Sequence, residues 1–135
     1  MSGRMLFVNL PVQDLGRARA FYEALGHRVH EGFSDETSVA VVIDDSIVVV
    51  LCTAERFAGL VAGGAGDPAR TTTAVHCLTA GSREEVDAAV AAALDAGGRP
   101  WLPAREDGLR YVGSYTDPEG NPWEVMWLDQ LHVVN

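Results

Sequence analysis

One pattern of residues occurs twice in this chain, and the repeat limits the folds that the chain can adopt. In each half a strand-like hydrophobic run, Leu6–Val12 or Thr73–Thr79, leads into a helical segment that ends at glycine. The equivalent positions Asn9 and Cys77 are 68 residues apart, about half of the 135-residue chain. Such a repeat predicts two copies of one supersecondary unit, with function in the concave surface that the copies build together.

The residues at the helix ends support both copies. Asp14 is suited to cap the first helix, and Gly26 supplies the left-handed position after it. Ser82 and Glu85 fit a capping box at the start of the second helix, which ends at Gly97. We therefore expect a helix after the first strand of each half.

Three further strand-like stretches follow each helix. They are His27–Phe33, Val39–Ile43 and Ile47–Thr53 in the first half, and Arg99–Leu102, Leu109–Thr116 and Trp123–Leu128 in the second. The glycine-rich segment Ala54–Arg70 is expected to connect the halves, with one short helical turn near Phe57–Val61. The sequence therefore predicts a single α+β domain, 1–135, with βαβββ modules at 1–53 and 73–135 and a connector at 54–72.

Composition and net charge limit the class of protein, its expected location and the kinds of ligand it could bind. The chain is 47% hydrophobic and 21% charged, as soluble globular domains are, and its apolar runs are too short to cross a bilayer. No secretory signal is expected, and Cys52 and Cys77 are expected to be thiols, so we predict a cytoplasmic protein. A net charge of −9 disfavours nucleic acid. It suits a cationic small molecule, a basic partner or simply solubility.

Three groups of motifs, which together cover nearly the whole chain, resemble one known family. They are Asn9-Leu10-Pro11-Val12 with Asp14-Leu15, Phe21-Tyr22 and Leu25-Gly26; Ser82–Asp87 with Ala96-Gly97-Gly98; and Asp117–Asn121 followed by Trp123-Glu124-Val125. The family is the vicinal oxygen chelate superfamily, which includes glyoxalase I, bleomycin resistance proteins and extradiol dioxygenases. The resemblance implies curved mixed sheets around a concave cleft. It is specific for the fold and not for a reaction.

The resemblance also implies where a metal would be bound. Metal-dependent members place a His, Gln or Glu ligand on the first and fourth strands of each module, and the matching positions here are Phe7, Val50, Val75 and Glu124. Three of these side chains cannot bind a metal, and one carboxylate alone would hold a divalent cation weakly. We therefore expect no metal cofactor and no metal-dependent activity.

One alternative depends on the register of the second module's first strand. His76 lies next to Val75 and would be a ligand if the register were off by one residue. Matching Leu10 with Leu78 pairs Val8 with His76, and side chains alternate between the faces of a strand. We therefore expect His76 to point toward the helix-packed side, although a one-residue slip would reverse it.

The same strand phase predicts the residues that line the cleft. The expected wall is mostly apolar with a few polar groups, a composition common in small-molecule sites. Three aromatic side chains would either stack on a planar ligand at the rim or complete the core. The candidate ligand-binding residues are Phe7, Asn9, Val50, Val75, Cys77, Glu124 and Met126, with Trp101, Tyr111 and Tyr115 at the rim; Val48 and Cys52 share the cleft-facing phase.

Glu124 is the candidate for chemistry, because a carboxylate in an apolar cleft is costly unless it is paired or protonated. It would bind a cationic group of a ligand or act as a general base. The structural alternative is an ion pair with Arg110 or another basic side chain.

The sequence favours metal-independent binding of a small, largely hydrophobic compound, cationic or aromatic, in the way that bleomycin resistance proteins sequester a drug. One alternative is a lyase, isomerase or dioxygenase of the same superfamily that uses Glu124 as base, so whether the protein is an enzyme stays open. Another is an interaction module with a vestigial cleft. Family members of this size commonly form two-fold dimers, so we expect a homodimer. Exposed apolar surface from Val133-Val134 and from Trp123 and Trp127 would contribute, although Trp127 fits the core equally well.

Overall fold

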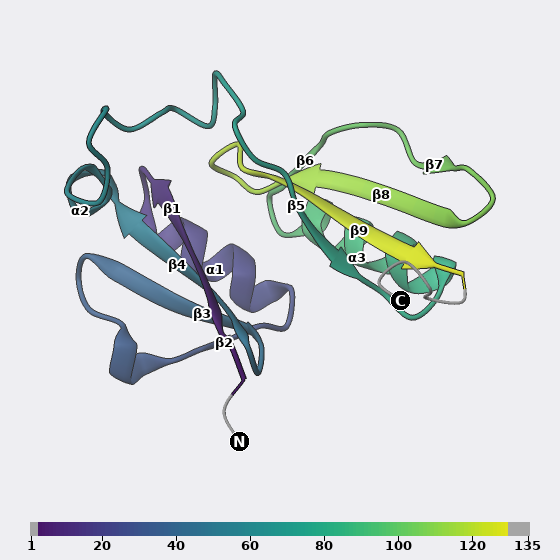
Figure 1. Ribbon diagram of the computed structural model, residues 1–135, viewed down its shortest axis with the longest axis horizontal. Helices are drawn as coiled ribbons and strands as arrows, with labels where there is room; N and C mark the ends of the chain where they lie inside the picture. The colour runs from purple at the N-terminus through teal and green to yellow at the C-terminus, as the bar shows by residue number, and fades with distance from the viewer. Residues whose placement is uncertain (1–2, 130–135) are drawn as a thin grey trace. The chain divides into compact units, whose positions relative to one another are not determined.

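The computed structural model describes residues 3–129, and the chain divides into two compact units between Thr71 and Thr72. Each unit contains its own sheet and its own packed helix (Figure 1). The division falls near the end of the expected connector, 54–72. The expectation of one domain over 1–135 stays a prediction.

The first unit is an open mixed sheet with one long helix packed on it and a short second helix in contact with its first and last strands (Figure 1). Its strands are ordered β1-β4-β3-β2, with β1 parallel to β4 and the other pairs antiparallel. The first and last strands of the module are therefore neighbours. Along the chain the elements are β1 (Leu6–Val12), α1 (Leu15–Ala24), β2 (Arg28–Val29), the 3-10 turn η1 (Glu31–Phe33), β3 (Ser38–Asp44), β4 (Ile47–Thr53) and α2 (Ala54–Ala58).

The second unit repeats this plan. Its strands are ordered β5-β9-β8-β6, with β5 parallel to β9, and β7 pairs with β8 as well. The elements are β5 (His76–Thr79), α3 (Arg83–Asp95), β6 (Arg99–Pro100), β7 (Arg105–Glu106), β8 (Arg110–Thr116) and β9 (Pro122–Leu128). The α+β class with mixed sheets, which the sequence predicts, is confirmed.

The helix caps expected from the sequence are present. The Asp14 side chain accepts a hydrogen bond of 3.0 Å from the backbone N–H three residues later. Ser82 Oγ accepts one of 3.1 Å from the N–H of Glu85. Gly26 and Gly97 follow the two helices with φ of 95° and 108°, a conformation that glycine adopts without strain.

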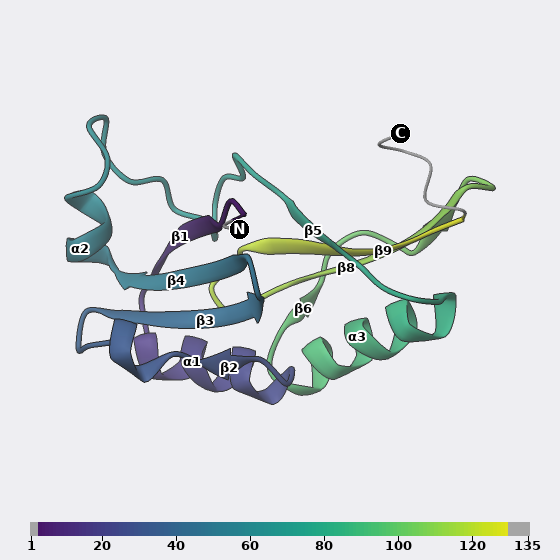
Figure 2. The same ribbon diagram turned by 60° about the horizontal axis from the view of Figure 1, so that its bottom comes forward.

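Helices α1 and α3 each pack along one face of their own sheet (Figure 2). Helix α3 approaches β8 closely because Gly113 has no side chain. A Cβ at Gly113 would lie 2.8 Å from Val90 Cγ2 and 3.0 Å from Val86 Cγ1. On the α1 side of the first sheet, the fully buried side chains include Ala18, Phe21 and Tyr22 from the helix and Val41, Val49 and Leu51 from the strands.

The last hairpin turns around a buried carboxylate. Asp117, which is fully buried, accepts bonds of 2.9 Å from the backbone N–H groups of Glu119 and Asn121. It also accepts a 3.0 Å bond from the Asn121 side-chain amide. These bonds satisfy the charge that burial would otherwise make costly, so the motif noted in the sequence fixes the turn.

The edge of the first sheet differs from the sequence prediction. A strand was expected over His27–Phe33, but only Arg28–Val29 pairs with β3. The chain then turns through η1, where the ring nitrogen Nδ1 of His30 accepts the N–H of Phe33 at 3.2 Å. This local bond competes with strand pairing, and propensity cannot reveal it.

The second unit also departs from expectation at its edges. The expected strands Thr73–Thr79 and Arg99–Leu102 shorten to β5 and β6. Strand β7 was not expected, because two charged residues offer no apolar alternation. In the connector, the helical turn expected near Phe57–Val61 lies earlier, in α2, where the Thr53 side chain caps it.

Two expectations concern partners. No helix within residues 3–129 is long and apolar enough to cross a bilayer. Trp123 is buried against His76, and the Trp127 ring lies 4.3 Å beneath the guanidinium of Arg83, so both contribute to packing within their unit. Val133-Val134 lie outside the described residues, and the homodimer stays a prediction.

Candidate functional site

The open face of the first sheet, on the side away from α1, carries the first module's candidates. Paired residues in parallel strands share a face, and Phe7 pairs with Val48 while Asn9 pairs with Val50. The Cys52 thiol donates a weak bond of 3.8 Å to Asn9 Oδ1 on the same face. Phe7, Asn9, Val48, Val50 and Cys52, which the sequence places on one face, therefore do share a face of the sheet.

In the second unit, Cys77 pairs with Glu124 on one face of the sheet, and His76 pairs with Trp123 on the other. The His76 and Trp123 rings are 5.3 Å apart, and burial lowers the pKa of His76. His76 and Glu124 therefore point to opposite faces and do not form a ligand pair. The Asn9–Val50 and Cys77–Glu124 pairs are equivalent, which supports the register inferred from the repeat.

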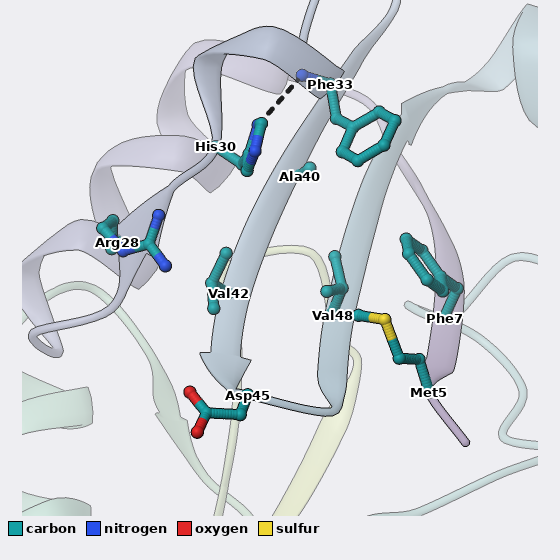
Figure 3. Close-up of a pocket in the computed structure, with 9 residues that line it drawn as sticks. All are labelled: Met5, Phe7, Arg28, His30, Phe33, Ala40, Val42, Asp45 and Val48. Carbon is teal, nitrogen blue, oxygen red and sulfur yellow. Dashed lines mark hydrogen bonds between the residues drawn. The ribbon is translucent and has the colours of Figure 1, made fainter. Parts of the chain in front are cut away.

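A pocket lies on the open face of the first unit (Figure 3). It encloses about 180 Å³, and its wall is mainly apolar. A comparable engineered cavity of about 150 Å³ binds benzene, so this pocket suits a single ring. It is lined by Met5 and Phe7 beside β4, by Val48, Ala40 and Val42 on β4 and β3, and by Arg28, His30, Phe33 and Asp45 around them.

Three polar side chains border the pocket, and they differ in what they offer a ligand. Arg28 is exposed at the β2 edge, and Asp45 lies in the turn between β3 and β4. His30 accepts the Phe33 N–H through Nδ1, so we infer that its neutral ring carries the proton on Nε2. The pocket thus offers a guanidinium, an imidazole N–H and a carboxylate.

Glu124 lies on the open face of the second sheet, and its carboxylate is paired. The Arg105 guanidinium approaches Glu124 Oε2 at 2.8 Å. This is the structural alternative considered from the sequence, with Arg105 as the partner in place of Arg110. Burial, and then the nearby Glu124 charge, raise the pKa of Cys77, so this thiol is not activated as a nucleophile. Met126 shares the same face.

The remaining candidates fall into two groups. Tyr115 pairs with Trp123 and is only 4% exposed, and burial raises its pKa to about 12. It therefore lies in the core, which was the alternative to a position at the rim. The Tyr111 hydroxyl donates a 2.6 Å bond to Asp87 of α3. Val75 and Trp101 are partly exposed, before β5 and after β6 respectively.

Among the ten predicted ligand-binding residues, only Phe7 lines the pocket. Sequence reasoning missed Arg28, His30 and Phe33 because it treated their segment as an ordinary strand of the sheet. One signal could have found Arg28. It pairs with Val42 across β2 and β3, and paired residues of antiparallel strands share a face, so Arg28 lies on the same face as Val42.

The side chains present do not fit a metal of the kind found in related enzymes. Phe7, Val50 and Val75 have no donor atoms, and the Glu124 carboxylate is held by Arg105. Within residues 3–129, no three His, Cys, Asp or Glu side chains gather as a ligand set. No step of chemistry is therefore assigned to a metal at these positions.

Comparisons with known proteins agree with this architecture. The family model "Bleomycin resistance protein-like N-terminal" matches residues 4–43. A hypothetical protein from S. aureus matches with a TM-score of 0.77 and 24% identity over 94% of each chain. A glyoxalase/bleomycin resistance protein/dioxygenase family enzyme from Burkholderia phytofirmans matches with a TM-score of 0.78 and 17% identity over 93% of this chain and 99% of its own. The chain has the vicinal oxygen chelate fold.

A further match to this fold has a named activity. Lactoylglutathione lyase from Agrobacterium tumefaciens has a TM-score of 0.69 and 20% identity over 93% of this chain and 94% of its own. No curated protein matches the chain significantly. Identities this low support the shared fold of the vicinal oxygen chelate superfamily, while the reaction of a fold relative does not transfer with the fold.

Proposed function

We propose that this protein binds a small, largely hydrophobic compound with a planar ring in the pocket of the first unit, and that it needs no metal to do so. The observation that carries the proposal is the apolar hollow with two exposed aromatic rings at its wall. Phe7 is 45% exposed and Phe33 is 67% exposed. A ligand that covers them removes apolar surface from water, which favours binding.

The size of the pocket limits the affinity expected for a single ring. A compound of this size gains only a fraction of a kcal/mol per atom in an ordinary site. For a probe such as benzyl alcohol we therefore expect a dissociation constant on the order of 1 mM. A larger natural ligand that extends beyond the pocket would bind more tightly.

The test is a titration of ¹⁵N-labelled protein with benzyl alcohol, followed by amide chemical shifts, with and without a chelator. We expect saturable shifts around Phe33 and Ala40 that the chelator leaves unchanged. Phe33→Ala should weaken binding about fivefold, because half of the aromatic wall is lost. Leu109→Ala is the matched control, since Leu109 is 68% exposed and lies outside the pocket.

Two results would overturn the proposal. One is that no neutral single-ring probe gives saturable shifts at the pocket. The other is that the chelator abolishes binding. The enzymatic alternative with Glu124 as base has less geometric support, because Arg105 already binds one of the two carboxylate oxygens at 2.8 Å.

A further inference from the structure

We infer that the ligand of this pocket is an aromatic carboxylate, and that Arg28 binds its carboxylate group. The inference rests on the proposed function and adds the charge and chemical class of the ligand. It begins with the position of Arg28. Arg28 pairs with Val42 across β2 and β3, so both side chains lie on the pocket face. Figure 3 shows the guanidinium directed from β2 toward the pocket wall.

Arg28 also differs from other arginines of the chain in its partners. Arg19, Arg83, Arg105 and Arg110 each form an ion pair with a carboxylate of their own unit. Among residues 3–129, the Arg28 side chain forms no ion pair or hydrogen bond. Asp45 lines the same pocket but does not reach ion-pair distance of Arg28. Arg28 therefore keeps its donors available for a ligand.

The chemistry of these donors favours a planar monoanion. A guanidinium presents parallel N–H groups that match the two oxygens of a carboxylate. The Nε2–H of His30 supplies one more neutral donor beside it. The apolar wall of Phe7, Val42 and Val48 takes the ring. A phosphate dianion suits the site less well, because among the described residues that line the pocket the Arg28 guanidinium is the only permanent cation, and Asp45 opposes a second negative charge.

The net charge of −9 does not contradict an anionic ligand. At physiological ionic strength, charges more than about 8 Å apart are largely screened. The local guanidinium therefore decides the charge preference of the pocket, while the surface charge affects mainly the rate of encounter. A cationic ring compound is the opposing possibility, since it would be drawn to Asp45.

The experiment compares three probes with one ring each: benzoate, benzamide and benzylammonium. Benzamide has nearly the shape of benzoate without its charge. We expect benzoate to bind about tenfold more tightly than benzamide, and benzylammonium to bind most weakly. In Arg28→Gln the preference for benzoate over benzamide should disappear. Arg28→Lys should keep part of the preference for benzoate, since the positive charge remains but the paired N–H donors of the guanidinium are lost.

Arg99→Gln is the matched control, because Arg99 on β6 occupies the equivalent place after the helix of the second module and lies outside the pocket. It should leave all three affinities unchanged. If benzamide binds but benzoate is no tighter, or if benzylammonium is tightest, the carboxylate inference is wrong and the proposed function stands. If no probe binds, both are wrong.

Discussion

The two open sheet faces have the same strand register and different chemistry. In the first unit, Asn9 pairs with Val50 on a face that is mainly apolar and hollowed by a pocket. In the second unit, the equivalent Cys77 and Glu124 lie on a face where the carboxylate is neutralised by Arg105. The two copies therefore share their strand pairing but differ in the side chains on the open face. A binding site inferred from one copy does not carry over to the other.

The helix-facing sides of the two sheets differ as well. Val39 pairs with Leu51 in the first unit, and its equivalent Gly113 pairs with Val125 in the second. Val39 is a buried side chain, whereas a Cβ at Gly113 would lie 2.8 Å from Val90 of α3. The same position thus tolerates a branched side chain in one copy and only a hydrogen in the other.

Replacing Gly113 with valine tests this difference most directly and has the largest expected effect. The new side chain would overlap Val86 and Val90, so we expect the free energy of unfolding to fall by about 3 kcal/mol. Urea unfolding followed by circular dichroism measures it. Gly63→Val is the control, since a Cβ there meets nothing within 4 Å. Equal midpoints for the two variants would contradict the close approach of α3.

The pH dependence of stability compares a half-buried imidazole in each unit. Burial lowers the pKa of His27 in the first unit and of His76 in the second. An unfolded histidine, with a pKa of about 6.5, binds protons more readily, so stability should fall as pH decreases from about 7.5 to 5. Above about pH 7.5 both histidines are neutral in the folded and the unfolded protein, so they do not make stability depend on pH there.

Urea midpoints at several pH values measure this effect in His27→Gln, His76→Gln and the double variant. Each substitution should remove part of the slope, and the double variant should have the flattest profile. A slope that is the same in the double variant would show that neither ring is buried in its neutral form.

Glu124→Gln has the smallest expected effect and tests whether the second face belongs to the site. Its ion pair with Arg105 is partly exposed, so we expect a loss of stability below about 1 kcal/mol. Benzyl alcohol titration should give the same affinity as in the unmodified protein. A large loss of binding would mean that the ligand site includes Glu124 and that the contrast between the faces is wrong.

The sequence predicts the parts of the fold that depend on local chemistry. Asp14 and Ser82 cap their helices, and the Asp117 turn forms, because each is set by side chains close in sequence. The alternation of strand side chains also places His76 and Glu124 on opposite faces. These features follow from periodicity and capping without knowledge of tertiary contacts.

The pocket depends on contacts that periodicity does not encode. The His30 ring bonds the Phe33 N–H and ends the strand, and this brings both rings to the pocket wall. The partner of Glu124 was missed for a similar reason, since Arg105 reaches it from β7, a strand with no apolar pattern. Both errors lie at sheet edges, where a few side-chain bonds outweigh strand propensity.

The short length of β2 has a consequence for self-association. Beyond Val29, the outer edge of β3 is occupied by loop atoms: His30 N–H donates to the Ala40 carbonyl at 2.8 Å, Ser34 Oγ accepts from the Ala40 N–H at 3.0 Å, and Asp35 N–H donates to the Ser38 carbonyl at 2.9 Å. With these groups satisfied, another chain has no free ladder to extend, which is how natural sheets avoid edge-to-edge aggregation. A change in this loop that removed these bonds would therefore expose the outer edge of β3 to pairing with another chain.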